Sequence, residues 1–391
     1  MLNKKIKVAV VFGSRSVEHE VSIVTAMQIF ENIDRQKYEV IPVYIDKSGR
    51  WLVSDKLQKI ENFKDLKLKN ISAKECLLVG SPNNKLISKS SFGFFKQIPV
   101  DIFMPLIHGT YGEDGTLQGL LEMADMPYTG SGVVGSAVGM DKIIQKAVFK
   151  DAGINTVKYV WFLKSQWRNG QKDKKEILDN IEKNLMYPLF VKPANLGSSV
   201  GINRASNLKE LENAIEIASH FDRRILIEEG KENIIEINCS VLGNSGDLQA
   251  SVCEQPINQS EKMLTYEDKY LKGGKTKGMA GLSRLVPAPI SDELAKKIQE
   301  TAKIAFGAVD ASGIARIDFL VDVEKNNIWI NEINTLPGSV SFYLWEKSGI
   351  DFKTLIDKLI DLGFEKYKEK KEITFSYETD LILKTSGGSK R

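Results

Sequence analysis

Cysteine and histidine are scarce in this chain, which contains 3 of each among its 391 residues. The cysteines are odd in number and widely spaced, at Cys76, Cys239 and Cys253. This spacing gives no basis for a disulfide framework. The histidines form no zinc-ligand spacing with the cysteines, so the sequence excludes a zinc enzyme.

Long apolar runs and a strong excess of one charge are also absent. No stretch reaches the roughly 20 apolar residues that a bilayer-spanning helix needs, and the basic start is followed only by the short run 8–12, without a signal-peptide cleavage site. A net charge of +3 is too small for this length to indicate a basic surface that binds nucleic acid. We therefore expect a cytoplasmic protein that binds neither membranes nor nucleic acid.

The length and the order of apolar segments predict an α/β protein of two or three domains. Strands are expected at 7–12, 38–45 and 100–107, with a helix from about Ser16, and this alternation favours a parallel sheet. Residues 46–97 are polar and irregular, which indicates an insertion with short strands. We place the domain boundaries at 1–130, 131–228 and 229–391.

Apolar periodicity also predicts the elements that follow. Strands are expected at 155–162, 189–192, 224–228, 234–242, 248–253, 315–323 and 328–333. Helices are expected at 136–150, 174–185, 207–219 and 291–306, the last with Ser291 as N-cap. The motif Gly130-x-Gly132-x-x-Gly135 resembles a dinucleotide fingerprint, but it does not follow the first strand of a βαβ unit. We interpret it instead as a hinge of small residues.

Two neighbouring predicted strands carry the most informative polar residues, Arg316-Ile317-Asp318 and Glu332-Ile333-Asn334. Side chains two positions apart on a strand share a face. Paired as a hairpin, the strands would bring Asp318, Glu332 and Asn334 together. Their oxygens are the ligands that magnesium takes when it also bridges nucleotide phosphates. The alternative is a polar strand face with one ion pair to Arg316.

Two Gly-rich turns are further candidate ligand sites. Lys192 ends a strand and is followed by a loop, residues 193–201, rich in glycine and serine, whose backbone N–H groups could approach a phosphate. The alternative is an ordinary turn after an edge strand. The segment from His108 to Gly115 follows a buried strand, where open α/β sheets bind ligands. Its acidic residues, like Glu20 near the first helix, could also act only as helix caps.

In this order, the segments resemble the D-alanine–D-alanine ligases of the ATP-grasp superfamily, over residues 8 to about 350. Residues 13–22 are similar to the N-terminal signature of the family, and 108–119 to its second signature. Residues 192–201 are similar to its phosphate loop, 266–270 to its mobile substrate loop, and 316–338 to its metal-binding strands. The resemblance implies an ATP-grasp fold behind an N-terminal parallel-sheet domain.

The resemblance also implies the roles of individual residues in joining two D-alanines through an acyl phosphate. Two Mg²⁺ or Mn²⁺ ions would be held by Asp318, Glu332 and Asn334. ATP would be bound by Lys142, Lys192, Ser199, Glu228, Glu229, Glu236 and Lys269. Glu20 would bind the ammonium of the first D-alanine, supported by a Ser198–Tyr270 link. Arg316 and the Gly338 N–H would stabilise the tetrahedral oxyanion, and residues 259–284 would form a lid over the acyl phosphate.

The sequence departs from the family pattern after Gly338. The segment that follows is shorter than usual. In a register without gaps, Tyr343 occupies the place of a serine that usually binds the second substrate's carboxylate, and Ser339 or Ser341 could replace that serine. The candidate substrate contacts are therefore His108, Ser339, Ser341 and Tyr343. D-Serine as acceptor, or a catalytically silent nucleotide-binding relative, stays open as an alternative, whereas Lys269-Tyr270 argues against D-lactate. The resemblance also implies a homodimer.

Overall fold

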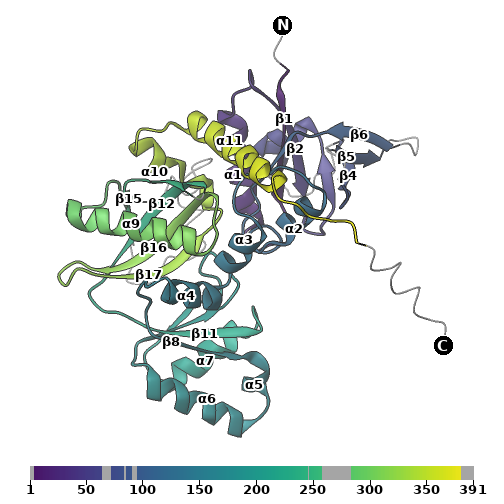
Figure 1. Ribbon diagram of the computed structural model, residues 1–391. Helices are drawn as coiled ribbons and strands as arrows, with labels where there is room; N and C mark the ends of the chain where they lie inside the picture. Colours follow the sequence, from purple (N-terminus) through teal and green to yellow (C-terminus); the bar gives the residue numbers. More distant parts are fainter. Residues whose placement is uncertain are drawn as a thin grey trace.

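The computed structural model describes residues 4–63, 72–82, 85–89, 95–244, 246–257 and 283–379. Three β-sheets of four or more strands follow one another along this part of the chain, each with its own helices (Figure 1). The residues predicted to form the mobile substrate loop, including Lys269 and Tyr270, lie outside the described residues.

The first sheet has the strand order β6-β5-β4-β3-β2-β1-β7. Its strands are β1 (Ile6–Gly13), β2 (Tyr38–Ile45), β3 (Trp51–Val53), β4 (Lys74–Leu78), β5 (Lys85–Lys89), β6 (Phe95–Pro99) and β7 (Ile102–Pro105). The helical segments are α1 (His19–Asn32), η1 (Asp55–Gln58), η2 (Ile60–Phe63) and α2 (Thr116–Met123). β1 pairs in parallel with β2 and β7, which confirms the predicted parallel sheet. The short strands expected in the insertion extend that sheet in antiparallel fashion.

The second sheet is antiparallel, with the order β10-β9-β11-β8. Its strands are β8 (Tyr159–Leu163), β9 (Leu189–Pro193), β10 (Asn203–Ala205) and β11 (Arg224–Glu229). Its helices are α5 (Lys164–Arg168), α6 (Gln171–Asn184) and α7 (Leu208–Ala218). Asn207 caps α7 by accepting a hydrogen bond from the Glu210 backbone N–H, which satisfies one of the unpaired donors at a helix start.

The third sheet is also antiparallel, with the order β13-β12-β16-β17. Its strands are β12 (Ile235–Asn244), β13 (Asp247–Ala250), β16 (Gly313–Asp322) and β17 (Asn327–Asn334). A small ribbon of β14 (Gln255–Pro256) and β15 (Arg284–Leu285) lies beside it. The helical elements in this part of the chain are α9 (Asp292–Ala308), η4 (Gly338–Ser341), α10 (Phe342–Lys347) and α11 (Phe352–Lys371). Ser291 caps α9 as predicted.

Two short helices connect the first sheet to the second, α3 (Val133–Met140) and α4 (Lys142–Asp151). The prediction of one helix over 136–150 was wrong, because Asp141 leaves the helical conformation and its carboxylate caps α4. Gly135 packs so closely on the chain that a Cβ there would lie 2.3 Å from the Asp310 carbonyl oxygen. Close backbone approach, not dinucleotide binding, accounts for glycine at this position.

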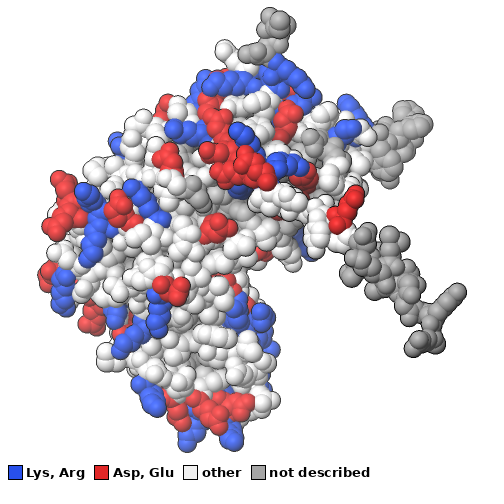
Figure 2. All heavy atoms as spheres, in the orientation of Figure 1, with Lys and Arg blue, Asp and Glu red and all other residues white. Residues whose placement is uncertain are grey.

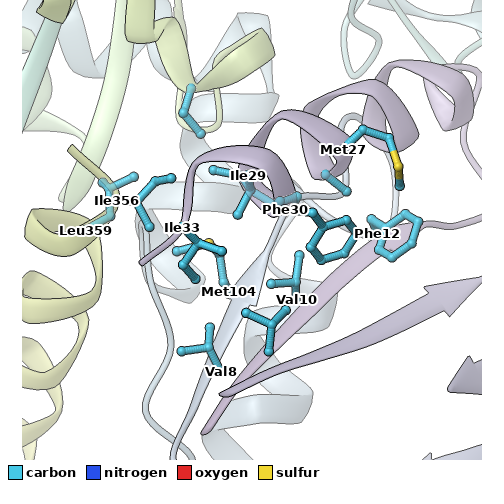
Figure 3. Close-up of a cluster of buried hydrophobic side chains, with 14 of the residues drawn as sticks. Val8, Val10, Phe12, Met27, Ile29, Phe30, Ile33, Met104, Ile356 and Leu359 are labelled. Carbon is cyan, nitrogen blue, oxygen red and sulfur yellow. The ribbon is translucent and has the colours of Figure 1, made fainter. Parts of the chain in front are cut away.

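The first and last parts of the chain share one hydrophobic core. Val8 and Met104 of the first sheet pack with α1 and with Ile356 and Leu359 of α11 (Figure 3). Figure 1 shows α11, the last helix, lying against this N-terminal region beside α1. Buried residues of α11 recur at helical spacing, as at Ile356, Leu359 and Ile360, so one apolar stripe faces the sheet.

Charged side chains are mixed on the surface. Figure 2 shows Lys and Arg interspersed with Asp and Glu on the face that it displays. Of the helices in the described ranges, none combines the length and the apolar character that crossing a bilayer would require.

Candidate active site

A deep cleft lies where the sheets meet, and it encloses about 1050 Å³ including its open mouth. Loops after strands of the first sheet supply one wall, and β12, β16 and β17 of the third sheet supply another. α4 and the loop after β9 contribute from the connecting and second-sheet regions. A smaller hollow shares Lys142, Ser198 and Asp318 with this cleft, so the two are continuous.

β16 and β17 bring the predicted metal ligands together at the floor of the cleft. Asp318 lies directly opposite Glu332, and the Asn334 amide donates to the Asp318 Oδ2 at 3.2 Å. All three line the cleft. Within the described ranges, no group of three or more His, Cys, Asp or Glu side chains forms a metal cage. By their chemistry, two carboxylates and an amide suit a cation that takes its remaining ligands from phosphate oxygens.

Cations hold these carboxylates in place. Arg316 donates from Nε and from one terminal nitrogen to the two oxygens of Asp318, at 2.6 Å each. Although burial alone would lower the pKa of Arg316, the adjacent Asp318 raises it further above its ordinary value, so the guanidinium is charged. Lys142 Nζ lies 2.9 Å from Glu332 Oε2 and donates to the Leu196 carbonyl at 3.0 Å.

A buried lysine pair adjoins this site, made of Lys192, which the sequence singled out, and Lys146, which it did not. Lys192 and Lys146 each contact one oxygen of Glu228, at 2.5 Å and 2.6 Å. Burial opposes ionisation of Glu228, but the two lysine charges lower its pKa to about 2. Lys146 follows Lys142 by one turn of α4, and this i, i+4 spacing is the signal that could have revealed it.

The loop after β9 contributes Ser198 and Ser199, both with positive φ, and both line the smaller hollow. Glu236 of β12 lines the cleft and the hollow. Glu228 and Glu229 line neither: Glu229 accepts hydrogen bonds from the Met186 N–H at 3.2 Å and from Lys231 Nζ at 2.7 Å. The prediction that Glu228 and Glu229 bind the adenine or ribose stays a prediction.

The predicted role of Glu20 is corrected. Glu20 is 57% exposed at its side chain and pairs with Lys47 at 3.5 Å. Glu18 instead lines the cleft and accepts a hydrogen bond from Ser198 Oγ. Two positions turn a helix by about 200°, so these two acids at the start of α1 face opposite directions, and only Glu18 faces the cleft.

The segment from His108 to Gly115 closes the end of the cleft near Glu18. His108 is fully buried, with Nδ1 at 3.0 Å from the Leu336 carbonyl and Nε2 at 2.9 Å from Thr25 Oγ1. Burial lowers its pKa to about 4, so His108 is neutral at pH 7. Burial and the nearby charge of Glu18 raise the pKa of Glu113 to about 8. The sequence singled out His108 but gave Glu113 only as a possible helix cap.

The serines after Gly338 do not reach the cleft. Gly338 itself lines the cleft, but Ser339 is 2% exposed and Ser341 is completely buried. Tyr343 is 8% exposed, and its hydroxyl donates to Glu254 Oε1 at 2.8 Å. The prediction that Ser339, Ser341 or Tyr343 contacts the second substrate is corrected for this reason: η4 and α10 turn these side chains into the protein. Arg284 and Glu254, which line the cleft here, were not predicted.

Comparison with known proteins agrees with this arrangement. A family model described as D-ala D-ala ligase N-terminus matches residues 7–131, and one described as D-ala D-ala ligase C-terminus matches residues 148–361. A D-alanine–D-alanine ligase of Chloroherpeton thalassium is 42% identical over 378 residues, covering 95% of this chain and 99% of the relative. One of Ruminiclostridium cellulolyticum is 42% identical over 386 residues, covering 94% and 97%.

Solved structures give the same result. The D-alanine–D-alanine ligase of Coxiella burnetii superposes with a TM-score of 0.77 at 30% identity, covering 94% of this chain and 96% of that one. The VanG D-Ala:D-Ser ligase of Enterococcus faecalis has a TM-score of 0.75 at 30% identity, covering 92% and 100%. The chain therefore belongs to the D-alanine–D-alanine ligase family and has its ATP-grasp fold.

Proposed function

We propose that this protein joins two D-alanine molecules to D-alanyl-D-alanine at the expense of ATP, for peptidoglycan precursor synthesis in the cytoplasm. The single observation that carries the proposal is the near-full-length match to relatives named D-alanine–D-alanine ligase, at 42% identity. D-Serine as acceptor has less support, since the D-Ala:D-Ser ligase among the structural neighbours is only 30% identical.

Asp318, Glu332 and Asn334 would hold two Mg²⁺ or Mn²⁺ ions. The fit rests on their chemistry, because two carboxylates face each other across β16 and β17 beside the Asn334 amide. When bound, such ions neutralise the terminal phosphates of a nucleotide. Lys142 and Lys192 would supply further positive charge from α4 and β9, next to the small-residue loop that bears Ser198 and Ser199.

Glu18 would bind the ammonium of the first D-alanine, and Ser198 would hold the Glu18 carboxylate in position by donating a hydrogen bond to it. The carboxylate of that D-alanine then points toward the metal ligands, where it receives the phosphoryl group. Attack by the second amine places negative charge on the former carbonyl oxygen. Arg316 and the Gly338 N–H, both in the cleft wall, would stabilise that charge, and preorganised donors of this kind contribute roughly 3–4 kcal/mol each.

The test is phosphate release by the purified protein with ATP, magnesium and D-alanine, together with mass-spectrometric detection of the dipeptide. We expect both products with D-alanine and neither with L-alanine. Asp318→Ala should lower the rate at least about 100-fold with the fold preserved by circular dichroism. Equal phosphate release with both enantiomers, or normal turnover by Asp318→Ala, would contradict the proposal.

The oligomeric state is a separate proposal, which rests on the family resemblance alone. We expect a homodimer, and light scattering coupled to size-exclusion chromatography measures its mass directly. A mass of one 43.8 kDa chain would contradict this expectation.

A further inference from the structure

A charged cluster that the proposed reaction does not yet use lies at one end of the cleft. Arg284 begins β15, and Glu254 immediately precedes its partner strand β14. A terminal nitrogen of Arg284 lies 2.7 Å from Glu254 Oε2, and the Arg284 side chain is only 10% exposed. Both residues line the cleft. The pair is therefore a buried ion pair in the wall of the cleft, not a surface one.

Two further residues fix the geometry of this pair. The Tyr343 hydroxyl and the Asn238 amide both donate to Glu254 Oε1, at 2.8 Å and 3.0 Å. The Arg284 guanidinium carbon lies 3.9 Å from the centroid of the Tyr343 ring. Stacking on an aromatic ring and pairing with a carboxylate hold the plane of a guanidinium in one orientation. Arg284 is thus preorganised before any substrate arrives.

Strand register places the cluster relative to the metal ligands. Glu254 bridges to Asn238, Asn238 pairs with Asp318, and Asp318 pairs with Glu332. Directly opposed residues share a sheet face, so these four side chains form one row across it. Two strand spacings separate Glu254 from Asp318, which is about 10 Å. A distance of this order separates the proposed metal ligands from the Glu254–Arg284 pair along one wall of the cleft.

The cations of the cleft divide between its two ends. Among the described lining residues, the cations are Lys142, Arg316 and Arg284. Lys142 pairs with Glu332 and Arg316 pairs with Asp318, both of which are proposed metal ligands. Arg284 pairs with Glu254, which is not one of them. Arg284 is therefore the cation at the end away from the metal ligands.

The acceptor in the proposed reaction needs a cation there. Its amine must face the acyl phosphate above Asp318, and its own carboxylate then points away from the metal ligands. A carboxylate taken out of water requires a paired charge and hydrogen-bond donors. A guanidinium offers five N–H groups in a fork that matches a carboxylate.

We propose that Arg284 binds the carboxylate of the second amino acid and thereby selects an α-amino acid as the acceptor. This inference rests on the ligase reaction proposed above. Tyr343, which takes the place of the family's serine in a register without gaps, acts as a positioning residue: it orients Arg284 through the ring contact and through Glu254. The departure after Gly338 then moves carboxylate recognition from that segment to β15.

The test compares two acceptors in the full-length protein, D-alanine and D-alaninamide, with D-alanine as donor and products separated by mass. Wild type should strongly prefer D-alanine. Arg284→Gln should lower kcat/KM for D-alanine as acceptor about 100-fold and change that for D-alaninamide less than about threefold, because the amide has no carboxylate to lose. Arg284→Lys keeps the positive charge but not the forked guanidinium, so its kcat/KM for D-alanine as acceptor should lie between the values for wild type and Arg284→Gln.

Trapping of the acyl phosphate with hydroxylamine isolates the first half of the reaction, which needs no acceptor. Arg284→Gln should form D-alanine hydroxamate at the wild-type rate, and Arg168→Gln on the exposed end of α5 serves as the matched control. An equal loss with both acceptors, or a loss of hydroxamate, would reduce Arg284 to a structural role. Absence of both hydroxamate and dipeptide from wild type would instead overturn the proposed function. Arg284→Lys decides the case if Arg284→Gln does not fold.

Discussion

At the start of α1, two carboxylates two residues apart face different surroundings. Glu18 is 7% exposed and holds the Ser198 hydroxyl across the cleft, whereas Glu20 extends to solvent beside Lys47. If a buried carboxylate that binds a substrate ammonium is removed, the ammonium charge is left without a partner in the cleft. The assignment of these two acids therefore has a direct consequence for activity.

We expect Glu18→Gln to lower kcat/KM for the first D-alanine about 100-fold, because the amide hydrogen-bonds to an ammonium but does not neutralise it. Glu20→Gln, the matched control one half-turn away, should stay within about twofold of wild type, because exposed charges contribute little. Steady-state dipeptide formation at varied D-alanine measures both. Similar losses in the two variants would show that Glu18 has no special role.

His108 makes stability depend on pH. Burial lowers its pKa to about 4 in the folded protein, against 6.5 for an unfolded chain. Between these values only the unfolded state binds the proton, so the contribution of His108 is complete above pH 6.5 and is lost as pH falls toward 4. One proton over this interval amounts to about 3 kcal/mol.

His108→Asn should therefore flatten the acid side of the stability profile. The Asn amide can still donate to the Leu336 carbonyl but takes up no proton. Urea unfolding at pH 7, 6, 5 and 4.5 measures the difference between variant and wild type, which should shrink as pH falls. A difference that is constant over this range would show that His108 does not titrate in this way.

How far the sequence predicts individual residues depends on the regularity of their local structure. Asp318, Glu332 and Asn334 were placed together correctly, because strand periodicity and a short hairpin determine their relative positions. Glu18 was missed because its direction depends on the phase of a helix start, which varies by one or two residues. Arg284 was missed because it was assigned to a long polar loop, and only tertiary pairing with β14 makes it part of a strand.

At the scale of elements, the turn after β1 carries Glu18 and depends on Gly13. Gly13 has φ of +97°, and a Cβ there would lie 2.2 Å from the Ile45 carbonyl oxygen. That carbonyl also accepts a hydrogen bond from the Ser14 N–H at 2.6 Å, so the turn is fixed against β2. A side chain at Gly13 must therefore displace the end of a central strand.

We expect Gly13→Ala to lower the free energy of unfolding by about 3 kcal/mol or more, since both the positive φ and the clash disfavour a side chain there. Gly153→Ala is the matched control, because Gly153 has φ of +74° but open space within 4 Å of its Cβ position. It should cost only about 1 kcal/mol. Guanidinium unfolding measures the free energy of unfolding of both variants. Equal losses would mean that the positive φ alone, and not the clash with Ile45, destabilises Gly13→Ala.

Element order was more predictable than element ends. The strands β2, β16 and β17 and the helices α7 and α9 lie where apolar periodicity placed them, within a few residues. The break between α3 and α4 was missed because helix-compatible residues continue on both sides of Asp141, with no proline between them. Aspartate is favoured at helix N-caps over helix interiors, so Asp141 was a signal for a helix start that apolar periodicity alone did not use.

At the scale of the whole molecule, α11 ties the C-terminal end of the chain to the first sheet. Leu359 is 3% exposed and Ile360 is completely buried, and both belong to the core that contains Val8 and Val10 of β1. Lys37 also pairs with Asp357 at 2.7 Å, on the exposed side of the same contact. The N-terminal strands therefore depend on residues more than 300 positions away, which no local pattern in the sequence indicates.

Leu359→Ala should thus destabilise the first sheet, not only the helix in which it lies. Removing a buried leucine side chain costs about 3 kcal/mol when the site does not collapse, and the shared core transmits this loss to β1 and β7. Native-state hydrogen exchange should show faster exchange at Val8–Val10 and in α11 together, by about 100-fold. Lys368→Ala, on the exposed face of α11, should leave both unchanged. Faster exchange in α11 alone would mean that the N-terminal sheet folds independently of the last helix.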